Sequence, residues 1–268
     1  MRIMCWHVHG SWMTSFVQGP HTYLVPTAED RGPDGRGRAD TYEWPDTVLE
    51  ISPAQLADAE VDLVVLQRPH ELALAEQWLR RRPGIDLPAV YVEHNTPKGE
   101  VPNTRHPMAG RDDIRLVHVT YFNQLMWDNG RAATAVIEHG IGDPGLRYVG
   151  TQARIGAAIN EPHRRGRVVG TDVLPRFARL APLDVYGIAA SRLVQEPGYD
   201  NVYGHDDLTQ PQLHEALAIR RVYLHPFRWT SLGLSLLEAA ALGVPIVALA
   251  MTEVVEAIPR DAGVVSNN

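Results

Sequence analysis

The sequence contains a single cysteine, Cys5, and no apolar run long enough to cross a membrane. One cysteine excludes an internal disulfide framework and fits a reducing compartment such as the cytoplasm. The N-terminal MRIMCWHVHG is too short and too interrupted by histidine to predict a signal peptide. A membrane-spanning helix needs about 18 apolar residues in succession. We therefore expect a cytoplasmic protein without an integral membrane segment, which leaves peripheral membrane contact open.

The chain also lacks an excess of positive charge. It has 25 Lys and Arg residues against 32 Asp and Glu residues, for a formal net charge of -7. Nucleic-acid binding needs clustered Lys and Arg to displace counterions from phosphates, so no nucleic-acid partner is expected. With 268 residues, 44% of them hydrophobic, the chain is long enough for two modest domains. The oligomeric state is left open by the sequence.

Apolar runs of strand length recur in the first half, and helical patterns follow several of them. The runs are RIMCWHV, TVLEI, DLVVLQ, PAVYVEH, RLVHVT and TAVIEHG. VDLVVLQ and PAVYVE are nearly continuous in apolar residues, which is typical of parallel strands covered on both faces. The intervening ELALAEQWLRRR predicts the crossover helix of a βαβ unit.

A second alternation begins after a Gly-rich segment near residues 141–153, which predicts a hinge. ARIGAAIN, LDVYGI and RVYLHP predict strands, and TDVLPRFARLA and QPQLHEALAIR predict helices. The fold class is thus α/β, with two Rossmann-like domains facing across a cleft. We expect an N-terminal domain over residues 1–145 and a short C-terminal domain over 146–268. Ligands of such sheets bind at the carboxyl ends of the strands.

The stretch after RVYLHP predicts a helix that starts near Ser231–Gly233, with a hydroxyl of Thr230 or Ser231 as its cap. The N-terminus of a helix after a strand is a natural phosphate site. Glu238 lies further along this helix among Leu and Ala residues, where an unpaired buried carboxylate is costly. Helix position alone favours a solvated or arginine-paired Glu238; the alternative partner is a pair of ligand hydroxyls.

SLGLSLLEAAALGVPIVALA, with the later VVEAIPRDAGVVS, resembles the signature of the family 4 nucleotide-sugar glycosyltransferases of the GT-B fold, the retaining group 1 glycosyltransferases. IGAAINEPHRRGRVVGTDVLPRF, YGHDDLTQPQLHEALAIRRVYLHP and VIEHGIGDP are similar to other segments of that family. The resemblance implies a hexosyl-type transferase. It would move a sugar from a nucleotide diphosphate donor to an acceptor hydroxyl with retention, and it would use no metal and no cofactor.

The resemblance also implies roles for particular residues. Glu238 would bind the nucleotide ribose, Arg164 would stabilise the departing diphosphate as a catalytic group, and His94 would orient the donor sugar. Gly10 is a weaker donor or acceptor contact, with turn geometry as the alternative. The full set of nucleotide and donor-binding candidates is Glu238, Ser231, Leu232, Gly233, Leu234, Thr230, Arg165, Arg167 and Gly10.

Three positions depart from the family pattern. Thr230 stands where the family has the first of two glutamates, Val169 replaces the lysine of a Lys-Gly pair, and Thr252 lies where a Gly-Gly pair is usual. The chain also stops at GVVSNN, where the family usually continues with further helices, so it is either shortened or an unusually small member. The missing glutamate keeps a non-catalytic binder of sugar nucleotides open as an alternative.

Several N-terminal residues have both structural and chemical interpretations. HGSWMTSF predicts a short helix capped by Ser11, and His94 could be a loop histidine satisfied by backbone. Strand alternation places Glu93 on the side opposite His94. Two further sets complete the candidates: His7 and His9, at alternate strand positions where packing is favoured over a metal, and the weaker His118, His139 and Asn123.

Two other enzyme classes are set against the transferase. A nucleotide-sugar epimerase on the same fold uses carboxylates for elimination, and analysis of the products separates it from a transferase. An NAD-dependent dehydrogenase is disfavoured because no G-x-G-x-x-G turn follows a strand.

Overall fold

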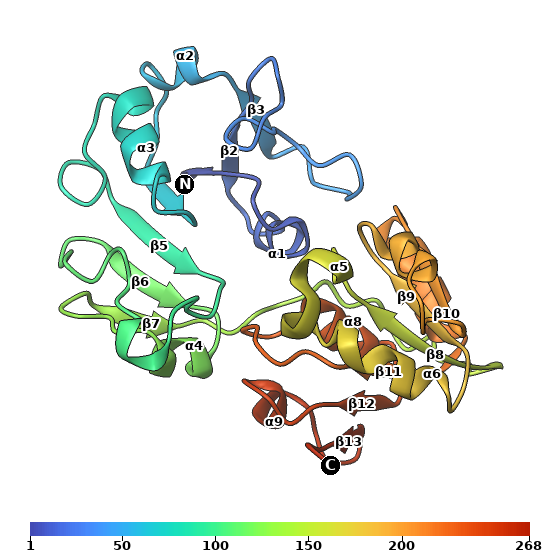
Figure 1. Cartoon of the computed structure of the whole chain (residues 1–268). Helices are drawn as coiled ribbons and strands as arrows, with labels where there is room; N and C mark the ends of the chain where they lie inside the picture. Colours follow the sequence, from blue (N-terminus) through green and yellow to red (C-terminus); the bar gives the residue numbers. More distant parts are fainter. The chain divides into compact units, whose positions relative to one another are not determined.

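The computed structural model describes residues 1–268, and the chain divides into two compact units, Met1–Gly142 and Asp143–Asn268. Each unit is built on one parallel sheet, which confirms the α/β class predicted from the alternation of strands and helices. In Figure 1 the first unit runs from blue to green and the second from yellow-green to red. No helix combines the length and the apolar character needed to span a bilayer.

The sheet of the first unit has the strand order β3-β2-β1-β4-β5-β6-β7. Its strands are β1 (Arg2–Cys5), β2 (Thr22–Pro26), β3 (Val48–Ile51), β4 (Leu63–Leu66), β5 (Ala89–Glu93), β6 (Arg115–His118) and β7 (Thr134–Val136). Its helices are α1 (Gly10–Phe16), α2 (Pro53–Leu56), α3 (Glu71–Leu79) and α4 (Tyr121–Met126), with a 3-10 turn η1 (Val101–Asn103).

The central strands of this sheet are buried on both faces. Val64 of β4 packs in the same cluster as Leu79 of α3, whereas its neighbour Val65 packs in the cluster that contains Met13 of α1. A strand covered on both sides needs apolar residues at successive positions, and this is why its sequence is continuously apolar. The crossover helix predicted after β4 is α3.

The second unit has the strand order β10-β9-β8-β11-β12-β13. The strands are β8 (Gln152–Ala158), β9 (Leu183–Tyr186), β10 (Val202–His205), β11 (Arg220–His225), β12 (Ile246–Ala248) and β13 (Gly263–Val265). The helices are α5 (Pro162–Arg165), α6 (Leu174–Ala178), α7 (Gln210–Ala218), α8 (Leu234–Ala241) and α9 (Val254–Ala257), with 3-10 turns η2 (Gly166–Val169), η3 (Thr171–Val173) and η4 (Ala190–Gln195).

The strand order reverses direction next to the first strand of each unit. In the first unit β1 lies between β2 and β4, and in the second β8 lies between β9 and β11. Such a switch point separates the loops at the carboxyl ends of two neighbouring strands and leaves room for a ligand there. The loops after β8 and β11 are therefore the natural place to look for a site in the second unit.

Several predicted boundaries are wrong for identifiable reasons. The first predicted strand ends at Cys5 rather than Val8, so His7 and His9 follow the strand and do not share a strand face. The predicted helix over 171–181 is a 3-10 turn followed by the short α6, which begins at Leu174 with Pro175 in its first turn. A proline in the first turn is tolerated because its missing N–H would have no partner there. Strands β2 and β10 were not predicted.

Candidate functional site

Helix α8 begins at Leu234, and Gly233 is its N-cap residue. The predicted hydroxyl cap from Thr230 or Ser231 is wrong, because the N-cap residue is Gly233 and no side-chain cap hydrogen bond is made there. The first turn also carries no acidic residue. A glycine N-cap leaves the N–H groups of the first turn and their partial positive charge for another acceptor. The start of α8 is therefore suited to bind an anion.

Gly233 is required by a close approach to His225, the last residue of β11. A Cβ at Gly233 would lie 2.6 Å from His225 Cε1. The His225 side chain is fully buried, its ring stacks on Phe227 at 4.4 Å, and neither ring nitrogen has a hydrogen-bond partner. Burial lowers the pKa of His225 to about 3, so the imidazole is neutral near pH 7. The start of α8 thus rests on an uncharged ring.

Glu238 is 3% exposed on α8 and is held by two side chains of α7. Gln210 Nε2 donates a hydrogen bond to Glu238 Oε1 at 2.9 Å, and His214 Nε2 lies 3.5 Å from Glu238 Oε2. No arginine pairs with Glu238, so the expected arginine partner is replaced by an amide and an imidazole. The carboxylate is partly compensated in the protein itself and keeps acceptor capacity for a ligand.

The arginine loop after β8 is tied to the segment after β11 by backbone contacts. Arg228 N and Trp229 N donate to Val168 O at 2.9 and 3.3 Å. Gly170 has φ +74, and a Cβ there would lie 2.1 Å from Pro226 O, so only glycine fits both the conformation and the space. The two loops at the switch point of the second sheet are therefore one connected structure.

The three predicted arginines have different surroundings. Arg164 is exposed and forms an ion pair with Glu161, with Nε 2.9 Å from Oε1, while Arg167 Nη1 donates to Asp172 at 2.7 Å. Arg165 forms no ion pair; its guanidinium lies 5.7 Å from the centre of the Phe227 ring. Burial and then the charge of Arg164 lower the pKa of Arg165 below its usual value. Arg165 thus has its charge available beside the segment that leads to α8.

In the first unit His94 lies in a cluster of aromatic rings. It follows β5, and its ring centre lies 4.3 Å from that of His9, 4.7 Å from that of Trp12 and 6.1 Å from that of His139. The sequence suggested His9 and His139 separately, and the structure brings them together with His94. Burial lowers the pKa of His9 and of His139 to about 4, and it lowers that of His94 well below its usual value.

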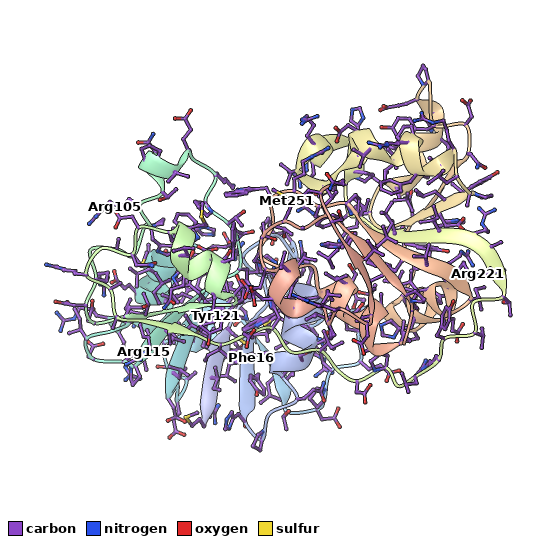
Figure 2. The ribbon with its side chains drawn as sticks, turned by 90° about the horizontal axis from the view of Figure 1, so that it is seen from below. Phe16, Arg105, Arg115, Tyr121, Arg221 and Met251 are labelled. Carbon is purple, nitrogen blue, oxygen red and sulfur yellow. The ribbon has the colours of Figure 1, made fainter.

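These rings gather at one end of the sheet of the first unit. Figure 2 marks Arg115, the first residue of β6, and Tyr121, the first residue of α4, which identify the amino and carboxyl ends of that strand. His94 and His139 follow β5 and β7 at the carboxyl end, and His9 follows β1. Parallel strands place their carboxyl ends on the same edge, so residues distant in sequence meet there.

Gly10 is the first residue of α1, and the predicted N-cap Ser11 is wrong because His9 is the N-cap. Ser11 lies inside the helix, where its hydroxyl lies 3.1 Å from Tyr42 Oη. A Cβ at Gly10 would lie 2.6 Å from Tyr42 Cε2. This contact accounts for glycine at position 10 by close packing.

Glu93, the last residue of β5, has partners of its own. Its carboxylate accepts hydrogen bonds from His106 Nε2 at 2.9 Å and from Asn95 N at 2.6 Å. The weaker candidates also have local partners: His118 Nε2 lies 2.9 Å from Asn129 Oδ1, and Asn123 N donates to Thr120 Oγ1. No group of three or more His, Cys, Asp or Glu side chains has a geometry suited to a metal ion.

The structure adds residues that the sequence did not single out. Gln210, His214 and His225 all contact the α8 region, and none was among the predicted site residues. The available signal was the i, i+4 spacing of Gln210 and His214, which places two polar side chains on one face of a predicted helix.

Comparison with known structures identifies the fold. The sucrose-phosphate synthase (tll1590) from Thermosynechococcus elongatus matches with a TM-score of 0.68 and 15% identity, over 99% of this chain and 85% of that one. Anabaena HepE, solved in complex with UDP and glucose, matches with a TM-score of 0.68 and 16% identity, over 100% and 86%. The two parallel-sheet units therefore have the fold of the GT-B glycosyltransferases.

Staphylococcus aureus TarM matches with a TM-score of 0.60 and 13% identity, over 77% of this chain. The chain spans only 45% of TarM, less than half of its length. No curated protein sequence is significantly similar to this one. Residues 166–268 match the family model described as Glycosyl transferases group 1. The matched segment lies within the second unit and agrees with the resemblance of its sequence to that family.

Proposed function

We propose that this protein transfers a sugar from a nucleoside diphosphate donor to an acceptor hydroxyl, and that the second unit binds the nucleotide. The observation that carries the proposal is the arrangement on α8, where an uncapped helix start and a buried carboxylate occur on the same helix. Leu234 and Glu238 are separated by about 6 Å of helix rise. This is the order of separation between the diphosphate and the ribose of one nucleotide.

Each end of this arrangement suits one part of the donor. The N–H groups at the start of α8 and the guanidinium of Arg165 are donors for the diphosphate, which gains negative charge as the sugar leaves. Donors that are fixed before the reaction stabilise this developing charge more than the ground state. Arg164 can join them when it exchanges Glu161 for the ligand. Glu238 accepts hydrogen bonds from ribose hydroxyls at the other end.

Retention of configuration and independence of metal are parts of the proposal that come from the family resemblance. In such a reaction the leaving diphosphate assists attack on the same face of the sugar, and the protein supplies binding and charge stabilisation. His94 has the role of orienting the sugar. The anomeric configuration of the product, read from the NMR coupling of its anomeric proton, tests retention, and activity in the presence of EDTA tests metal independence. An inverted product or loss of activity with EDTA contradicts these parts alone.

Nucleotide binding is the first test. Calorimetric titration with UDP, GDP, dTDP and ADP should identify one preferred nucleotide; UDP is the natural first ligand because HepE was solved with it. Glu238→Ala should weaken binding by about 10-fold or more, since hydrogen bonds to a charged group contribute about 1.5–3 kcal/mol. Arg164→Ala and Arg165→Ala should weaken it through the diphosphate. Exposed Glu215 on α7 provides the control Glu215→Ala. Absence of binding by every nucleotide refutes the proposal.

A non-catalytic binder of sugar nucleotides is the second candidate, and Thr230 is the observation that favours it. The family places a glutamate in contact with the donor sugar at this position. If the missing carboxylate limits catalysis, Thr230→Glu should raise the rate of sugar transfer or donor hydrolysis without tightening nucleotide binding. Nucleotide binding without any turnover in the wild-type chain supports the binder. Turnover by the wild-type chain that Thr230→Glu leaves unchanged refutes a limiting role for this position.

A further inference from the structure

Helix α7 brings two polar side chains to Glu238 from a single face, and one of them, Gln210, donates a hydrogen bond. Gln210 is its first residue and His214 follows four residues later, so the side chains lie one turn apart. The start of the helix is fixed by Thr209, whose backbone N–H donates to Gln212 Oε1 at 2.9 Å. The position of Gln210 therefore follows from a well-defined helix start rather than from a loose loop.

The two side chains approach different oxygens of the Glu238 carboxylate. Gln210 Nε2 contacts Oε1 at 2.9 Å, and His214 Nε2 approaches Oε2 at 3.5 Å. An ionised carboxylate has about four acceptor sites, two on each oxygen. The hydrogen bond on Oε1 and the imidazole beside Oε2 restrict the plane of the carboxylate and leave acceptor capacity on both oxygens. A vicinal pair of hydroxyls can then donate one hydrogen bond to each oxygen.

The same two residues limit the cost of burying the Glu238 carboxylate without a ligand. Glu238 is 3% exposed and lies on a helix whose neighbouring residues are Leu and Ala. A buried carboxylate without polar partners would be several kcal/mol less stable. A rotated carboxylate would not present both oxygens to two hydroxyls. The polar side chains of α7 therefore prepare the group for a diol.

We propose that Gln210 and His214 are positioning residues that set the orientation of Glu238 and thereby the preference of the site for ribonucleotides over 2′-deoxyribonucleotides. The inference rests on the proposed function, because it assigns the diol to the ribose of the donor. Removal of the 2′-hydroxyl deletes one of the two ribose hydroxyls that donate to Glu238. One acceptor position of this buried carboxylate is then left without a hydrogen bond. A site built to bind a hydroxyl discriminates strongly against the analogue that lacks it.

The test is calorimetry on the full chain with UDP, GDP and ADP, each compared with its 2′-deoxy form. The measured quantity is the ratio of the two dissociation constants for the base that binds best. Gln210→Leu should reduce this ratio by about fivefold, as expected for the loss of one hydrogen bond. His214→Leu should reduce it through the loss of the polar group beside Glu238 Oε2, and His214→Gln keeps a polar group there and should retain most of the preference. Glu215→Ala, an exposed change on the same helix, should leave the ratio unchanged.

A purely structural role for α7 predicts a different outcome, in which ribonucleotide and deoxyribonucleotide lose affinity equally and the ratio stays the same. A ratio of dissociation constants that is unchanged in both leucine variants overturns the inference, while nucleotide binding and the proposed function stand. Failure of the wild-type chain to bind any nucleotide overturns the proposed function instead. Near-UV circular dichroism checks the fold. Gln210→Ala provides the same comparison at a half-buried position if a leucine variant does not fold.

Discussion

Asp184 lies at the centre of a charged cluster in the sheet of the second unit, and its removal has a predictable cost. Its carboxylate accepts hydrogen bonds from Arg154 at 2.6 and 2.7 Å, from Arg220 at 2.7 Å and from His205 at 2.9 Å. The side chain of Asp184 is 2% exposed, and that of Arg220 is 10% exposed. Asp184→Asn preserves the shape but leaves two arginines on one face of the sheet without their counter-charge.

The size of the effect follows from burial. Removing one partner of a buried ion pair typically costs about 3–5 kcal/mol, and the lower end applies here because Arg154 reaches water. We expect a loss of about 3 kcal/mol in the free energy of unfolding of the second unit, or about 10 °C in its melting temperature. The matched control is Asp172→Asn: Asp172 also binds two arginines, Arg167 and Arg228, but it is 34% exposed. That change should cost less than about 1 kcal/mol.

The pH dependence gives a second check on Asp184. Burial alone would raise its pKa, but hydrogen bonds from Arg154 and His205 and the charge of Arg220 outweigh burial and hold the pKa below its usual value. A carboxyl group with a lowered folded-state pKa stabilises the fold fully above its unfolded pKa of about 4, and this contribution is lost as the pH falls through the folded value. Urea unfolding should therefore separate wild type and Asp184→Asn at pH 7 and bring them together at strongly acidic pH. Equal costs for Asp184→Asn and Asp172→Asn at pH 7 would refute the reasoning.

Two further predictions concern the histidines. Gly233→Ala should destabilise the second unit by about 1–3 kcal/mol because its methyl group would overlap the His225 ring. In the double variant, His225→Ala should relieve part of that cost. If urea unfolding shows that the two costs are strictly additive, the contact is contradicted. The pKa values of His9 and His139 are lowered to about 4, so both histidines take up protons only on unfolding, and the first unit should lose stability as the pH falls from about 6.5 to 4. His9→Phe should flatten that slope, and an unchanged slope refutes the buried neutral state.

The parts of the fold that the sequence predicted are those with a strong local signal. Strand β4 is covered on both faces, so its sequence is a continuous run of apolar residues that predicts a buried strand. Strand β10 was not predicted because Gly204 interrupts it and glycine weakens a strand pattern. The reason for that glycine is tertiary: a Cβ at Gly204 would lie 2.2 Å from Ala190 O of η4. Contacts between elements that are distant in the sequence cannot be predicted from the local pattern of apolar and polar residues.

The residues of the candidate site also divide into those that the sequence singles out and those that only the fold reveals. The sequence singles out Glu238 and Gly233 because they belong to a long ordered motif; Gly233 is the N-cap residue of α8, and Glu238 lies within the helix. Their partners were not found, because Gln210 and His225 belong to other elements and only the fold brings them within reach. The predicted hydroxyl cap failed for a related reason, since a nearby serine satisfies the local preference but its backbone lies outside the capping position.

Locally unfavourable residues are concentrated around the start of α8, which supports a ligand site there. Helix α7 of the same unit begins with Thr209 and Gln212 in mutual contact, whereas α8 begins with glycine and has no cap. Close to that start lie a fully buried neutral histidine, His225, and a nearly buried carboxylate, Glu238. Each of these features costs stability, and they cluster at the switch point of the sheet, where ligands bind. Because α7 already holds the carboxylate in place, a nucleotide would find its ribose acceptor arranged before binding, and less of its binding energy would be spent on ordering the site.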